Sequence, residues 1–251
     1  MEAQPVSTGE ERKMRLGNII QITDHLILPF GTAKKFDLQK ITLAAVAANG
    51  IYLRADIPCV YINVAERKPL RLLDFFSVFD RGRGSSPKGD DVMAMLDFIH
   101  QIIAQHMPTE TTTRHEATFL KDYFEFVKDY ALITEPFGRY NALLPIPQMQ
   151  LYVHDVLDFD RWSFEPNNNF RVDFGFWTGT KLIAVEIDGN EPEGYARDIR
   201  RDRLLRRAEV DVVHILNTEI DKHGVRLMMR LLPQSIAFDW TEAAVPERPP
   251  S

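Results

Sequence analysis

The chain has 251 residues, of which 45% are apolar and 26% charged, and its formal net charge is −6. This length fits one large domain or two small ones, with enough apolar residues to bury a core. Because the net charge is negative, any contact with nucleic acid must use a local cluster of cations. The only cysteine, Cys59, excludes an intramolecular disulfide and a cysteine-based zinc cluster.

Hydropathy and cysteine content predict where the protein works. No apolar stretch approaches the ~20 residues that a membrane span needs, and residues 1–14 lack the apolar segment of a signal peptide. We therefore expect a soluble cytoplasmic protein without membrane contact. Cys59 lies in the apolar run 57–62, which favours a buried structural thiol over a nucleophile.

The first half of the chain predicts a polar arm at residues 1–17, then short strands around one helix. The helical pattern covers residues 37–49 and ends at Gly50. Four β-like runs flank it, at residues 19–22, 25–29, 51–54 and 59–63. The basic loop 81–90 is either a solvated linker or a loop that contacts phosphate. Residues 91–107 then show a strong amphipathic helix pattern.

The second half predicts the order α–β–β–β–α–β, which is typical of a mixed α/β fold. Thr113 and Glu116 have the spacing of a capping box, so a helix is expected from Thr113 to about Tyr130. Loop and strand are expected at residues 140–152, strands at 170–176, 181–187 and 210–216, and helices at 194–208 and 223–231.

Three carboxylates lie on the central pair of these strands. Glu186 and Asp188 point to one side of their strand, because side chains alternate. The Thr178-Gly-Thr180 turn can bring Asp173 beside Glu186. Converging carboxylates repel one another unless a cation lies between them, and oxygen ligands suit Mg²⁺ or Mn²⁺. The pattern therefore predicts a metal site, with a structural acidic cluster as the alternative.

The set Asp173…Glu186-x-Asp188 resembles the PD-(D/E)xK nuclease superfamily, above all its compact branch related to very-short-patch-repair endonucleases. Further segments follow in the family's order over about residues 111–220. They are a first helix with Glu116, a Pro-Gln segment ending at Gln148, a basic helix with Arg201, and a closing strand at residues 210–215.

The resemblance implies a restriction-endonuclease-like mixed sheet and metal-dependent hydrolysis of phosphodiester bonds in DNA, in restriction, repair or anti-phage defence. The family's metal ligands match Asp173, Glu186 and the backbone carbonyl of Ile187. Its auxiliary catalytic carboxylates match Glu116 and Asp188. The cofactor implied is Mg²⁺ or Mn²⁺, which would polarise the scissile phosphate and activate a water molecule.

The sequence departs from the family at several positions. Asp188 stands where the superfamily usually has a lysine, and so adds negative charge where a positive charge is expected. No histidine follows Gly189, where this branch often has one, so the general base is not identified. Glu209 and His214 replace the usual glycine and arginine near the closing strand.

The helix at residues 194–208 is rich in arginine, with Arg197, Arg200, Arg201, Arg203, Arg206 and Arg207. The first three begin nearest the acidic strand and are predicted to bind nucleic acid, together with Gln148. One of them could also provide the cation that the missing lysine would supply. The alternative is a solvated helix with internal pairs through Asp198 and Asp202.

We divide the chain into a polar arm (residues 1–17), an N-terminal α+β region (18–107), a nuclease-like domain (108–235) and a tail (236–251). The expected partner is nucleic acid, and the region 18–107 could dock a protein partner; self-association is left open. The rival hypothesis, motivated by the missing lysine and histidine, is a catalytically inactive nuclease-fold subunit that binds protein or nucleic acid.

Overall fold

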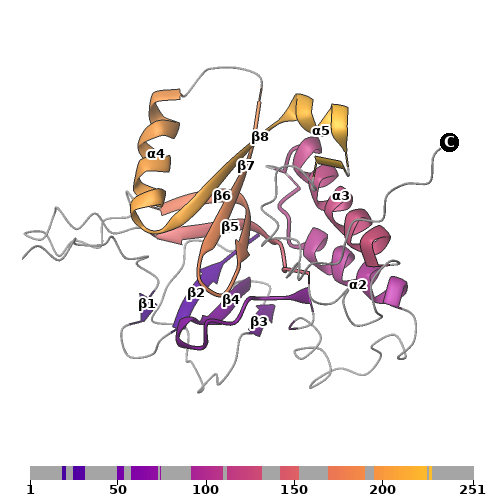
Figure 1. The fold of residues 1–251 in the computed structure, drawn as a ribbon, viewed down its shortest axis with the longest axis horizontal. Coiled ribbons are helices and arrows are strands. Elements are labelled where there is room, and N and C mark those ends of the chain that lie inside the picture. The colour runs from indigo at the N-terminus through magenta and orange to yellow at the C-terminus, as the bar shows by residue number, and fades with distance from the viewer. Residues whose placement is uncertain are drawn as a thin grey trace, which may run out of the picture.

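The computed structural model describes residues 19–20, 25–31, 50–53, 58–72, 74, 92–109, 112–131, 142–152, 169–189, 195–224 and 226–227. These residues form two four-stranded sheets and four α-helices (Figure 1). The predicted arm 1–17, helix 37–49, loop 81–90 and tail 236–251 lie outside the described residues.

The first sheet is antiparallel, in the order β1-β2-β4-β3. Its strands are β1 (Ile19–Ile20), β2 (His25–Pro29), β3 (Gly50–Leu53) and β4 (Pro58–Asn63), followed by the short 3-10 helix η2 (Val64–Glu66). These positions agree with the β-like runs of the sequence. Cys59 on β4 is a free, fully buried thiol, which confirms the predicted burial.

The second sheet is mixed, in the order β5-β6-β7-β8. Its strands are β5 (Ile146–Tyr152), β6 (Asn169–Trp177), β7 (Leu182–Asp188) and β8 (Val210–Leu216). The first three pair antiparallel, whereas β8 runs parallel to β7. A parallel pair needs a crossover connection, and helix α4 (Tyr195–Arg207) lies in it. The mixed α/β class predicted from the sequence is confirmed.

The other helices are α2 (Val92–Gln105), α3 (Arg114–Ala131) and α5 (Asn217–His223). The predicted capping box of α3 is present: Thr113 Oγ1 accepts a hydrogen bond from the Glu116 N–H, and Glu116 Oε1 accepts one from the Thr113 N–H, both at 3.2 Å. Helix α5 ends at His223, where Gly224 adopts a φ of 50°. Of the helix predicted at residues 223–231, residues 226–227 are helical, and residues 225 and 228–231 lie outside the described residues.

One hydrophobic core joins the two sheets, since buried side chains of β2, β4, α2, α3 and β5–β8 form a single cluster. Hydrogen bonds also cross between the two regions. The Gly31 N–H donates to the Pro147 carbonyl at 2.9 Å, and Trp177 Nε1 donates to the Lys68 carbonyl at 2.8 Å. The N-terminal strands therefore support the mixed sheet directly. Among the described helices, none is long and apolar enough to cross a membrane.

Helices cover both faces of the mixed sheet, with α4 on one side and α2 and α3 on the other (Figure 1). Phe119 of α3 packs on Phe174 of β6, with ring centroids 4.9 Å apart. Asp173 and Phe174 are neighbours on the strand and point to opposite faces. The carboxylate of Asp173 therefore lies on the face that α4 covers.

Candidate functional site

Four polar residues form one row across the mixed sheet. The register that pairs Pro147 with Phe174 and Met149 with Val172 sets Gln148 opposite Asp173. Continuing the pairing of Phe174 with Val185 by one residue sets Asp173 opposite Glu186.

On the far side of β7, the parallel register pairs Glu186 with His214 of β8. The row therefore runs from Gln148 through Asp173 and Glu186 to His214, one residue from each strand. Directly opposed residues of a sheet interact through their side chains, so the row places two carboxylates between an amide and an imidazole.

Asp173 lies where the antiparallel ladder between β6 and β7 ends. Its Oδ2 accepts a hydrogen bond of 2.7 Å from the backbone N–H of Ile187, in place of a backbone carbonyl. The N–H and C=O of one residue in an extended strand point to the same edge. The carbonyl of Ile187 thus faces the same gap as the Asp173 carboxylate.

Gln148 links Asp173 to helix α3. Its Nε2 donates to Glu116 Oε2 at 2.6 Å and, more weakly, to Asp173 Oδ1 at 3.4 Å. A φ of 48° at Gln148 interrupts the regular pairing with β6 and turns this side chain out of the normal strand direction. Glu116 is buried, and its other oxygen belongs to the capping box, so α3 holds the carboxylate rigidly.

Glu186 is buried close to the Arg201 guanidinium of α4. The ion pair joins Arg201 Nη1 to Glu186 Oε1 at 3.4 Å, and Oε1 accepts no hydrogen bond from any described residue. A buried carboxylate oxygen without a hydrogen bond is costly. The Arg201 guanidinium therefore leaves Glu186 Oε1 able to bind a further cation.

Burial and neighbouring carboxylates both raise the pKa values of the two acids. Burial raises the pKa of Asp173 to about 6, and the charges of Glu116 and Asp188 act in the same direction. Burial, followed by the charge of Asp173, raises the pKa of Glu186 to about 9 against the opposing charge of Arg201. A further cation between these carboxylates would restore their ionised forms.

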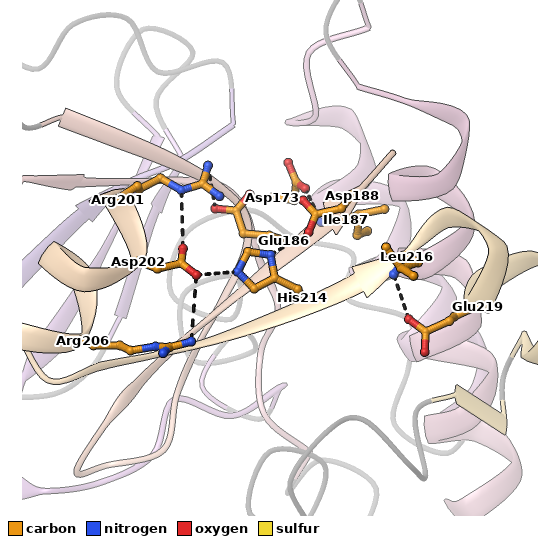
Figure 2. A network of polar contacts seen from close by, with 10 residues as sticks. All are labelled: Asp173, Glu186, Ile187, Asp188, Arg201, Asp202, Arg206, His214, Leu216 and Glu219. Atoms are coloured by element: carbon orange, nitrogen blue, oxygen red, sulfur yellow. Dashed lines mark hydrogen bonds and ion pairs between the residues drawn. The ribbon is translucent and has the colours of Figure 1, made fainter. Parts of the chain in front are cut away.

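A second network lies beside the carboxylates, between β7, β8 and α4 (Figure 2). His214 Nδ1 is 2.6 Å from Asp188 Oδ2, and His214 Nε2 is 2.7 Å from Asp202 Oδ2. Arg201 and Arg206 each approach Asp202 at 3.9 Å. Asp188 therefore lies between Glu186 on its own strand and a partly buried cluster of opposite charges.

The structure brings most of the predicted site residues together. Seven of them are connected by hydrogen bonds, an ion pair or charge interactions. They are Glu116, Gln148, Asp173, Glu186, Ile187, Asp188 and Arg201. Arg200 is exposed on α4, where no described residue pairs with it. Arg197 belongs to α4, but its side chain lies outside the description.

Sequence reasoning misses two members of the site. His214 is noted there only as a departure from a family pattern, and Asp202 only as a partner within its helix. A β–α–β unit places β8 beside β7, which could have indicated that a residue of β8 lies near Glu186. Nothing in the sequence identifies that residue as His214.

Among the described residues, no three His, Cys, Asp or Glu side chains are arranged as a ready metal cage. The groups that fit a hard divalent cation are fewer: the Asp173 and Glu186 carboxylates with the Ile187 carbonyl. All three supply oxygen, which Mg²⁺ and Mn²⁺ prefer, and Mg²⁺ commonly keeps several water ligands. The unbonded Glu186 Oε1 and the raised pKa values of both carboxylates favour such a cation.

A scan against protein-family models finds no match for this chain, and searches of curated proteins and of solved structures find none either.

Proposed function

We propose that the protein is a metal-dependent nuclease that hydrolyses phosphodiester bonds, with DNA as its expected substrate. The observation that carries the proposal is the pair formed by the half-buried Asp173 and the buried Glu186. It lies where β6 and β7 separate, and burial, assisted by neighbouring carboxylates, raises the pKa of both groups. A phosphodiesterase needs this arrangement to hold a divalent cation against a phosphate.

The order of the elements supports the same proposal. Helix α3, strands β5, β6 and β7, helix α4 and strand β8 follow one another as the resemblance to the PD-(D/E)xK nucleases implies. We infer a restriction-endonuclease-like core for residues 108–235 on this ground. A role in restriction, repair or anti-phage defence is consistent with the resemblance, which is its only support.

Asp173, Glu186 and the Ile187 carbonyl would hold Mg²⁺ or Mn²⁺. When bound, such an ion neutralises charge on the phosphate and lowers the pKa of a coordinated water. Glu116 is fixed by Gln148 and the capping box and orients polar groups at the α3 side of the pair. Arg201 lies on the α4 side, where its guanidinium takes the place of the missing lysine as a fixed cation.

Cleavage of plasmid DNA and of labelled DNA and RNA oligonucleotides with Mg²⁺, Mn²⁺ or a chelator tests the proposal. We expect metal-dependent cutting that Asp173→Asn and Glu186→Gln each reduce by at least about 100-fold, since ligand loss removes the metal. Asp211→Asn is the matched control, because Asp211 is an exposed carboxylate of β8 that pairs with Lys181. Calorimetric titration with Mn²⁺ gives a readout that does not depend on activity.

The rival, a non-catalytic nuclease-fold subunit, has one specific observation in its favour: Arg201 already partly neutralises Glu186 without a metal. It predicts no cutting and no difference in Mn²⁺ affinity between the native chain and Glu186→Gln. That result would overturn the proposed enzyme, as would metal-dependent cutting that survives both carboxylate substitutions.

A further inference from the structure

An open groove of about 710 Å³ lies beside the carboxylates, between α4 and the ends of β7 and β8. Its lining residues on α4 recur every three or four positions and form one stripe of the helix. They are Ile199, Asp202, Arg203, Arg206 and Arg207, with Asp188 and His214 contributed by the sheet.

The opposite stripe of α4 faces the core, where Leu204, Leu205 and Ala208 are buried. The described arginines of α4 therefore lie on different sides of the helix. Arg201 points inward to Glu186, whereas Arg203, Arg206 and Arg207 are exposed along the groove. The helix is thus a scaffold with one apolar side and one cationic side, not an evenly solvated rod.

The acidic residues of the groove are already engaged. Asp188 and Asp202 each contact one ring nitrogen of His214, at 2.6 Å and 2.7 Å. Arg206 also approaches Asp202. Arg203 and Arg207 form no ion pair with any other described residue, and their guanidinium groups remain available to a ligand.

We propose that this groove binds the phosphate groups of a nucleic-acid strand next to the bond that is cut, with Arg203 and Arg207 as the principal contacts. The inference rests on the proposed nuclease function, and it names how that site holds its substrate. Asp188 belongs to both places, because it lines the groove and lies two residues from Glu186 on the same face of β7. A strand along the groove therefore passes Asp188, two residues from Glu186.

Charge complementarity and spacing support phosphates as the ligand. Guanidinium groups bind phosphate oxygens in a bidentate manner, and two or three of them along one helix stripe suit a chain of evenly spaced anions. Ile199 is 43% exposed at the same stripe and offers an apolar contact to a sugar or base. The net charge of −6 makes such a local cluster necessary for nucleic-acid binding.

The test is binding of a fluorescein-labelled oligonucleotide to the full chain in EDTA, measured by anisotropy at several salt concentrations. We expect Arg203→Ala/Arg207→Ala to weaken binding at least 10-fold and to reduce the slope of log affinity against log salt by about 1 for each arginine that contacts a phosphate. The control variant Lys121→Ala/Arg226→Ala removes two exposed cations away from the groove and should bind like the native chain.

The outcomes separate this inference from the proposed function. Binding in EDTA that depends on Arg203 and Arg207 supports the groove even if no cutting is found with any metal. Equal losses in the two double variants, or no oligonucleotide binding by the native chain, overturn it. Competition by poly-glutamate as strong as that by unlabelled oligonucleotide also overturns it, because the groove would then be a general polyanion site.

Discussion

At the scale of single residues, His214 decides the charge of the region between the buried carboxylates and the groove. The hydrogen bonds to Asp202 and Asp188 raise the pKa of His214, although burial, the largest single influence, acts to lower it. The two carboxylates come from different elements, α4 and β7, so the imidazolium also fastens the helix to the sheet. Arg206 is a further charge near this group, through Asp202.

The pH dependence of this contact follows from the direction of the shift. Because the folded state raises the pKa of His214, the pair with Asp202 stabilises the fold fully below the ordinary histidine pKa of about 6.5. That stabilisation is lost as pH rises through the folded value. A double-mutant cycle of His214→Gln and Asp202→Asn should give a coupling of about 0.5–1 kcal/mol at pH 6, after allowance for solvent screening.

The same cycle at pH 9 should give a clearly smaller coupling. Denaturant unfolding in the presence of EDTA measures both values without interference from bound metal. A coupling that is equal at the two pH values, or larger at pH 9, would contradict this pH dependence.

At the scale of elements, helix α3 holds Glu116 through its first turn. Thr113→Ala removes the side-chain acceptor of the capping box and should destabilise the protein by about 1 kcal/mol, measured by thermal or denaturant unfolding. Thr118→Ala is the matched control, because the Thr118 hydroxyl only donates back to the Arg114 carbonyl of the same helix. Such bonds stabilise a helix little, so the control should be neutral. Similar losses in both variants would contradict a role for the cap.

Most elements near the site are predictable because their signals are local. The capping pair Thr113 and Glu116 predicts the start of α3, and the Thr178-Gly-Thr180 turn predicts the hairpin that brings Asp173 opposite Glu186. Alternation along β7 also places Glu186 and Asp188 on one face. The Glu186 side chain is nevertheless buried, whereas that of Asp188 is 39% exposed, a difference that alternation does not predict.

The remaining parts of the site depend on register and packing. His214 lies near Asp188 because β8 pairs with β7 in one register, which depends on the burial of the two strands in the folded protein. Gln148 reaches Glu116 through a backbone conformation with positive φ, which its residue type does not demand. The sequence also shows six arginines on one helix. Which of them face Glu186, the groove or solvent depends on how the helix packs, and the sequence does not show it.

At the scale of the whole molecule, the N-terminal strands and the mixed sheet share one core, so the candidate site depends on both. The Arg171 guanidinium on β6, two residues from Asp173, donates to the Gly31 carbonyl at 3.0 Å. The end of the β6–β7 turn also packs on the N-terminal region, since a side chain added at Gly179 would meet the Arg67 carbonyl at 2.5 Å. These contacts hold β6 and the β6–β7 turn against the N-terminal region. We therefore expect the two sheets to unfold together as a single cooperative unit.

This cooperativity can be tested with Leu28, a fully buried residue of β2 that is distant in sequence from the carboxylates. Leu28→Ala should cost about 2–5 kcal/mol through lost burial and a cavity, and hydrogen exchange followed by mass spectrometry should show the same loss of protection in β4 and β7 peptides. Leu216→Ala is the control, because Leu216 is 44% exposed and its truncation should cost under about 0.5 kcal/mol. If protection falls in β4 while β7 keeps it, the mixed sheet is stable alone and the N-terminal strands are an addition to the site rather than its support.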